Sequence, residues 1–139
     1  MINLQKISGL PILFDEKNLR LEFRGDFPFI KKSERSLEEL KPYLKNPDVK
    51  KRLPASRQEP DPVYQVWRYA HLKKDDKIIK TANLRYDLTL IPPGTIGGEF
   101  VKTAGHYHKP YPEIYEVLMG HAYFLIQSEL AVYLVEASS

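Results

Sequence analysis

The chain has 139 residues, with 21 Lys or Arg against 18 Asp or Glu and a formal net charge of +3. It contains no cysteine, which excludes disulfides and thiolate metal sites and fits a reducing cytoplasm. No apolar run is long enough to cross a membrane, and the first residues lack the basic and apolar regions of a signal peptide. We therefore expect a cytoplasmic protein without a membrane partner, built as one domain over residues 1–139.

Residues 1–62 predict a loop-rich N-terminal arm with one short strand and one short helix. Residues 18–24 alternate apolar and polar side chains, as a half-buried strand does. Ser36 with Glu39 three positions later indicates a capping box that opens a helix, and Pro42 limits its length. The basic excess within residues 41–57 has no aromatic platform or helix-turn-helix pattern beside it. We expect a solvated surface there and no nucleic-acid partner.

Residues 63–139 predict a β-barrel core. Short runs rich in β-branched and aromatic residues are separated by proline, glycine or charged turns, and residues 73–77 predict an exposed turn. The expected strands cover residues 63–70, 84–91, 98–102, 114–119, 122–127 and 130–136. Many short strands with such turns are typical of an antiparallel sandwich or barrel, so the fold class is all-β.

A metal site is the strongest chemical signal in the sequence. His106 and His108 are two positions apart, so on a strand their side chains point to the same face and converge. Two prolines then break the strand, and Glu113 opens the next extended run, from which it can face the imidazoles. Two imidazoles and one carboxylate suit a divalent transition metal such as iron, manganese, nickel or zinc. Tyr107 lies between the histidines, so we expect it on the opposite side, in packing contacts.

The histidines belong to a longer pattern that is similar to a known family. Thr-Ala-Gly-His-Tyr-His occupies residues 103–108, Glu-Ile-Tyr follows at 113–115 and a glycine stands at 120. A second pattern, Thr-Leu-Ile-Pro-Pro-Gly, occupies residues 89–94. Together they resemble the first motif of the cupins and, within that family, the archaeal-type glucose-6-phosphate isomerases. The resemblance implies a jelly-roll β-sandwich or barrel, with Lys-Lys-Ser at 31–33 in the N-terminal region.

The resemblance also implies an activity and a role for each motif residue. Aldose–ketose isomerisation moves a hydrogen between C2 and C1 of a sugar phosphate, by a base or by a hydride shift beside a metal. In the family, the position of Glu113 is both metal ligand and candidate base, and Tyr115 contacts the sugar near the metal. Thr89, Thr103 and Gly105 would hold the phosphate through two hydroxyls and one backbone N–H.

One departure from the family pattern concerns the C-terminal end. The second cupin motif contains glycine, proline and a further histidine ligand, and none of these follows Glu129. We therefore expect the C-terminal strands of the barrel to be incomplete, which leaves open edges on strands such as residues 63–70. Open strand edges favour a homodimer built through antiparallel pairing. His71 and His121 are expected to be ordinary turn or strand-end residues rather than substitutes for the missing ligand.

Two other functions stay open at this point. A cupin dioxygenase also uses two histidines and a carboxylate, although the phosphate-type threonines argue against it. A non-catalytic sugar- or metal-binding cupin fits the missing second motif.

Overall fold

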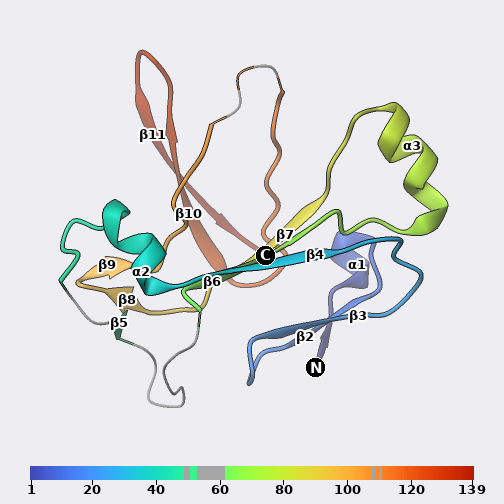
Figure 1. Ribbon diagram of the computed structural model, residues 1–139, viewed down its shortest axis with the longest axis horizontal. Coiled ribbons are helices and arrows are strands. Elements are labelled where there is room, and N and C mark those ends of the chain that lie inside the picture. The colour runs from blue at the N-terminus through green and yellow to red at the C-terminus, as the bar shows by residue number, and fades with distance from the viewer. Residues whose placement is uncertain (49–50, 53–61, 108, 110) are drawn as a thin grey trace.

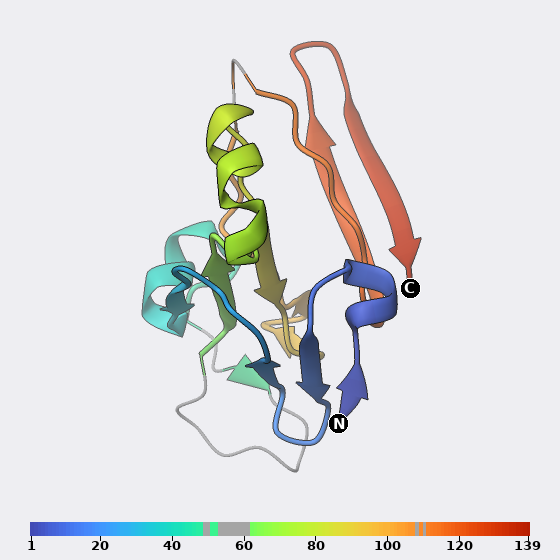
Figure 2. The same ribbon diagram turned by 90° about the vertical axis from the view of Figure 1, so that its right-hand side faces the viewer.

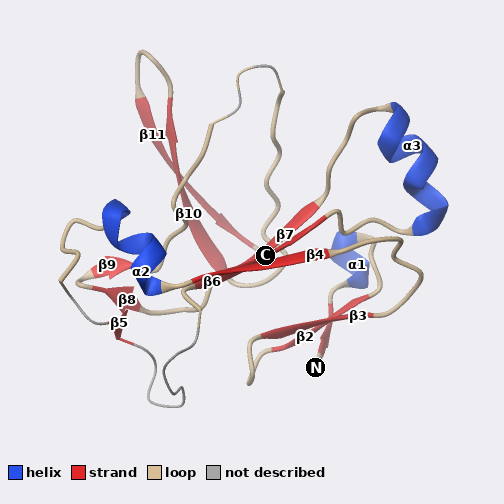
Figure 3. Ribbon diagram, in the orientation of Figure 1, coloured by secondary structure: helices blue, strands red, loops and turns tan. Residues whose placement is uncertain are grey.

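The computed structural model describes residues 1–48, 51, 52, 62–107, 109 and 111–139, and Figure 1 traces the chain. Within these ranges the strands form antiparallel sheets of two or three members, and the helices have at most six residues (Figure 3). The all-β class expected from the sequence is confirmed. These sheets do not close into a barrel within the part of the chain that the structure describes.

The first sheet comes from the N-terminal residues and has the order β1 (Ile2–Asn3), β2 (Ile12–Asp15), β3 (Arg20–Phe23), with helix α1 (Gln5–Ser8) between β1 and β2. Asp15 shapes the β2–β3 turn, because its Oδ1 accepts hydrogen bonds from the backbone N–H groups of Lys17 and Asn18, each at 3.1 Å. The strand expected over residues 18–24 is confirmed as β3. The N-terminal arm is thus more regular than its sequence indicates.

The central sheet has the order β4 (Lys31–Arg35), β6 (Tyr64–Arg68), β7 (Asp87–Leu90). Side chains on β6 alternate between the two faces, so Trp67 and Gln65 point one way and Tyr64, Val66 and Arg68 point the other. Strand β6 pairs on both sides, and the expectation that residues 63–70 leave an open edge is therefore wrong.

Helix α2 (Leu37–Leu40) follows β4 and leads into a short 3₁₀ turn, η1 (Lys41–Tyr43). Its N-terminus is the predicted capping box: Glu39 N–H donates to Ser36 Oγ at 3.3 Å, and Ser36 N–H donates to Glu39 Oε2 at 2.9 Å. The box satisfies backbone donors that the first turn leaves unpaired. The capping-box prediction is confirmed.

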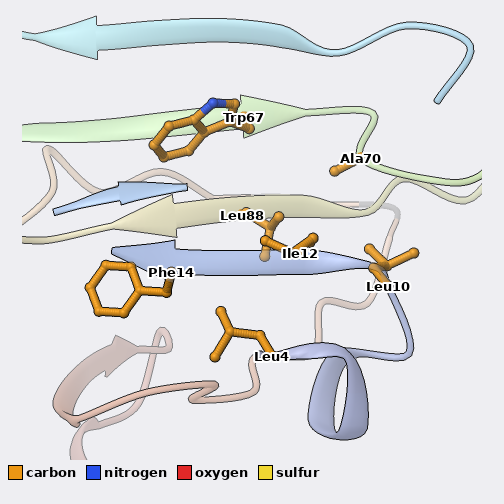
Figure 4. Packing of buried hydrophobic residues seen from close by; sticks show 7 residues of the cluster. All are labelled: Leu4, Leu10, Ile12, Phe14, Trp67, Ala70 and Leu88. Atoms are coloured by element: carbon orange, nitrogen blue, oxygen red, sulfur yellow. The ribbon is translucent and has the colours of Figure 1, made fainter. Parts of the chain in front are cut away.

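Two hydrophobic cores lie on opposite faces of the central sheet. The first core packs the N-terminal sheet against it and is shown in Figure 4; it consists of Leu4, Leu10, Ile12, Phe14, Trp67, Ala70 and Leu88. The second core fills the other face and consists of Leu40, Leu44, Val63, Tyr64, Ile96 and Val101. Burial of these apolar side chains is the main term that stabilises the arrangement.

Residues 72–83 differ from the exposed turn that was expected around 73–77. They form a 3₁₀ turn, η2 (Lys73–Asp75), and helix α3 (Asp76–Thr81). Asp76 accounts for the difference, since it pairs with Lys80 one turn along the helix and with the Nε2 atom of buried His71 at 3.1 Å. His71 thus has a structural contact, in line with its expected role as a turn residue.

The remaining strands form a small sheet of β5 (Lys51–Arg52), β8 (Thr95–Ile96) and β9 (Glu99–Phe100), and a hairpin of β10 (His121–Gln127) and β11 (Val132–Ser138). The hairpin confirms two expected strands. The turn that connects β10 and β11 projects away from the N-terminal sheet in Figures 1 and 2. The strand expected over residues 114–119 is wrong, because this segment lies outside any helix or strand. The other expected strands are present in shortened form as β6, β7 and β9.

Candidate metal and sugar-phosphate site

The segment that carries the motif leaves β9 and crosses the second core before it reaches the histidines. Val101 is buried in that core, and Ala104 N–H approaches the Tyr64 hydroxyl oxygen at 3.5 Å. Gly105 has φ +76°, a left-handed conformation that other residues adopt only with strain. Residues 101–107 are not a strand, so the strand expected to carry His106 is wrong, while the alignment of His108 lies outside the described residues. A glycine turn sets the direction of His106 instead.

The structure brings three of the predicted site residues together. The Nε2 atom of His106 lies 3.2 Å from Oε1 and 3.2 Å from Oε2 of Glu113. The Tyr115 hydroxyl lies 3.5 Å from the same Nε2 atom. When Nε2 donates its proton to Glu113, it has no lone pair left to accept from Tyr115, so the Tyr115 contact is a close approach. All three side chains come from loop segments and are partly open to solvent.

Tyr115 is held as a neutral phenol. Its partial burial raises its pKa to about 12, and the hydrogen bond to the Glu113 carboxylate and the negative charge of that carboxylate act in the same direction. The Tyr115 ring also packs against Phe124 on β10, with ring centroids 5.1 Å apart. At neutral pH the group is therefore a hydrogen-bond donor next to the His106–Glu113 pair.

The spacing of His106 and Glu113 fits two ligands of one metal ion. Two donor atoms that are each about 2.1 Å from a metal and subtend the tetrahedral angle of about 109° lie about 3.4 Å apart, close to the 3.2 Å between His106 Nε2 and the Glu113 oxygens. No group of three metal-binding side chains gathers among the described residues. His108, the third expected ligand, lies outside the described residues. The structure thus describes two of the three expected donors, His106 and Glu113, in contact with each other.

The three predicted phosphate-binding residues lie on two elements. Thr103 and Gly105 are exposed on the loop on either side of Ala104, next to His106. Thr89 is exposed on β7 and faces the same side of the central sheet as its cross-strand neighbour Val66. Tyr64 belongs to that face as well, so its contact with Ala104 connects the sheet face of Thr89 to the loop of Thr103 and Gly105.

The sequence did not predict that Tyr64 and Phe124 contact the site loop, and it predicted the wrong environment for Tyr107. Tyr64 and Phe124 support the loop from β6 and β10. The alternation of β6 indicates the face of Tyr64, but a contact with a loop 40 residues away has no local signal. Tyr107 was expected in packing contacts, and this is wrong, because its side chain is 81% exposed.

Comparison with known proteins identifies the family. The family model described as "Glucose-6-phosphate isomerase (GPI)" matches residues 34–136, a range that holds the whole His106–Glu113–Tyr115 cluster. The chain belongs to this family. This confirms the resemblance inferred from the motif.

Curated relatives agree with the family assignment. The chain is 32% identical over 114 residues to a glucose-6-phosphate isomerase of Thermococcus litoralis, covering 79% of the chain and 55% of the relative. It is 32% identical to one of Pyrococcus abyssi, covering 75% and 52%, and 33% identical to one of Thermococcus onnurineus, covering 75% and 51%. The chain thus spans about half the length of the curated relatives it matches. No solved structure gives a significant match.

None of the helices in the described ranges is long and apolar enough to cross a membrane.

Proposed function

We propose that the protein is a metal-dependent isomerase that interconverts glucose 6-phosphate and fructose 6-phosphate. The observation that carries this proposal is the cluster of His106, Glu113 and Tyr115, which stands inside the segment matched by the family model. An imidazole, a carboxylate and a neutral phenol supply a metal ligand, a proton acceptor and a hydrogen-bond donor within one small volume.

His106, His108 and Glu113 would hold the divalent metal. When bound, the metal supplies Lewis-acid stabilisation of the negative charge that develops on the C1 and C2 oxygens. The Glu113 carboxylate, 3.2 Å from His106 Nε2, would remove the proton from one carbon and return it to the other. Tyr115 remains protonated near neutral pH, so its hydroxyl would donate a hydrogen bond to a sugar oxygen.

The phosphate would lie between the β7 face and the 103–105 loop. The hydroxyls of Thr89 and Thr103 and the N–H of Gly105 are the donors for its oxygens, and all three residues are solvent-exposed. Among the described residues, and apart from its chain neighbours, no heavy atom lies within 4 Å of where a Cβ of Gly105 would stand, so its backbone is open to close approach by a ligand.

We further propose that two copies associate through the β10–β11 hairpin and that the enzyme works in the cytoplasm. The hairpin is a two-stranded sheet with large exposed apolar side chains, among them Leu125, Val132 and Leu134, which are 74%, 61% and 68% exposed. The cytoplasmic assignment rests on the proposed substrate, because a charged sugar phosphate does not cross a membrane unaided.

The test is a coupled assay of glucose 6-phosphate and fructose 6-phosphate interconversion before and after chelation, with metal restored afterwards. We expect turnover that chelation abolishes and added metal restores. Incorporation of solvent deuterium into the product distinguishes proton transfer by Glu113 from a hydride shift. Sugar-phosphate binding without turnover would establish the binding-module alternative, and oxygen uptake would establish the dioxygenase.

A further inference from the structure

We propose that Arg68, held in position by Ser33, is a specificity-determining residue that binds the phosphate of the substrate beside Thr89. The inference rests on the proposed function and adds a cation to a subsite that the sequence motif builds from neutral donors alone. It assigns Arg68 to phosphate binding and Ser33 to positioning.

The register of the central sheet places the three residues together on one face. Val66 pairs with Ser33 on β4 and with Thr89 on β7, and Arg68 is two positions further along β6. Arg68 is therefore diagonal to Ser33 on one side and to Thr89 on the other. Diagonal neighbours are about 7–8 Å apart, within reach of a long side chain. This face is also the one that meets the 103–105 loop through Tyr64.

The guanidinium of Arg68 is fixed by a neutral partner. Its Nη1 atom donates a hydrogen bond of 2.7 Å to Ser33 Oγ, and the side chain is partly buried. Within the described part of the chain, Arg68 forms no ion pair with a carboxylate. Because a hydroxyl does not neutralise the positive charge, Arg68 keeps its capacity to bind an anion.

The carboxylate directly across the sheet from Arg68 already has other hydrogen-bond partners. Asp87 is the direct cross-strand partner of Arg68, but its Oδ2 accepts from Arg85 Nε at 3.0 Å and its Oδ1 from the backbone N–H of Tyr69 at 3.3 Å. Lys31 stands opposite Arg68 on β4 and adds a second positive charge to the same face. The face next to Thr89 is therefore electropositive and complementary to a phosphate dianion.

The chemistry of the guanidinium suits this task. Arg presents parallel N–H donors that match two phosphate oxygens, and such charge-assisted bonds are about twice as strong as neutral ones. The Ser33 bond restricts the side chain before the ligand arrives, which lowers the ordering cost of binding. A sugar without phosphate gains nothing from this cation, so Arg68 would set the preference for the phosphorylated substrate.

The experiment compares Arg68→Gln and Arg68→Lys with Arg24→Gln, a matched loss of one arginine directly after strand β3, where Arg24 pairs with Glu22. We expect Arg68→Gln to raise KM for glucose 6-phosphate and the inhibition constant of inorganic phosphate by about tenfold or more, with kcat nearly unchanged. Arg68→Lys should lie in between, because it keeps the charge without the planar fork. Ser33→Ala should raise KM less, and Ser33→Thr should restore it.

The outcomes separate this inference from the proposed function. The role of Arg68 would be overturned if the wild type isomerises and folded Arg68→Gln has the same KM and the same inhibition constant for phosphate. The proposed isomerase function would still stand. If the wild type does not isomerise, calorimetric titration with inorganic phosphate decides instead. Phosphate binding that is lost in Arg68→Gln and kept in Arg24→Gln would support the subsite, and equal binding in both would overturn it.

Discussion

The aromatic ring of Tyr115 packs against that of Phe124, with centroids 5.1 Å apart, and this contact ties the site loop to strand β10. At the other end of the loop, Ala104 contacts Tyr64 on β6. The segment with His106 and Glu113 is therefore supported from two different sheets although it has no regular structure itself. A functional site needs support of this kind to hold its side chains in place.

Metal binding is the first property to test. We expect the wild type to retain about one divalent metal per chain after dialysis, and a His106→Ala/His108→Ala double variant to lose it, because removal of two ligands leaves only a carboxylate. His121→Ala is the matched control, since His121 is an exposed histidine paired with Glu136 at 2.8 Å on the hairpin. Elemental analysis measures the content. Equal metal in wild type and double variant would refute the ligand assignment.

Glu113→Gln should lower kcat by about 100-fold or more, because the amide neither accepts the proton nor offers an anionic ligand. Glu116→Gln removes a neighbouring exposed carboxylate and should leave turnover close to that of the wild type. Steady-state kinetics on metal-loaded protein provides the comparison. If kcat falls by a similar factor in both variants, the loss of one negative charge explains it, and Glu113 has no special role.

Much of the fold could be predicted because its signals are local. The alternation in β3, the β-branched and aromatic composition of β6 and the Ser36–Glu39 capping box each depend on neighbouring residues, and each element is present in the structure. Strands of two residues such as β1 are too short to show a period. Helix α3 was missed because its charges indicate a turn, whereas the Asp76–Lys80 and Asp76–His71 contacts that stabilise it depend on helical and tertiary geometry.

The site also combines features with a local sequence signal and features that depend on long-range contacts. The pairing of His106 with Glu113 could be predicted from residue type and spacing, and it does not need the strand that was expected to align it. The segment 114–119 has strand-like composition, but a strand also needs a pairing partner, and composition does not provide one. Ile114 there is 94% exposed. The supports from Tyr64 and Phe124 are long-range contacts that no local pattern encodes.

The first core should dominate the stability of the N-terminal half. Ile12 is fully buried between the two sheets, so Ile12→Ala should lower the free energy of unfolding by about 2–5 kcal/mol through lost transfer energy and a residual cavity. Ile78→Ala makes the same chemical change on α3, where Ile78 is 65% exposed, and should have little effect. Chemical denaturation of both variants tests this. Equal destabilisation would contradict the assignment of Ile12 to the core.

The hairpin should carry the dimer contact. Leu134 lies on β11 directly opposite Leu125, and both are exposed, so Leu134→Glu would place a charge in the middle of the proposed interface. We expect light scattering at micromolar concentration to show a dimer for the wild type and a shift towards monomer for Leu134→Glu. Ile78→Glu, an exposed apolar residue on α3, should leave the dimer intact. A monomeric wild type would exclude this form of association.

The Tyr115 phenol should titrate later than an ordinary tyrosine. Burial is the largest cause of its raised pKa, and Glu113 adds to it, so Tyr115 should ionise at about pH 12 in the folded protein. Since the folded pKa exceeds the unfolded value, the contribution of Tyr115 to stability is complete below about pH 10 and is lost as the pH rises towards 12. Glu113→Gln should lower the pKa only part of the way, because burial against Phe124 remains. Ultraviolet difference titration against Tyr115→Phe measures this one ionisation, and a transition near pH 10 in the wild type would show that the phenol is neither buried nor bonded to the carboxylate.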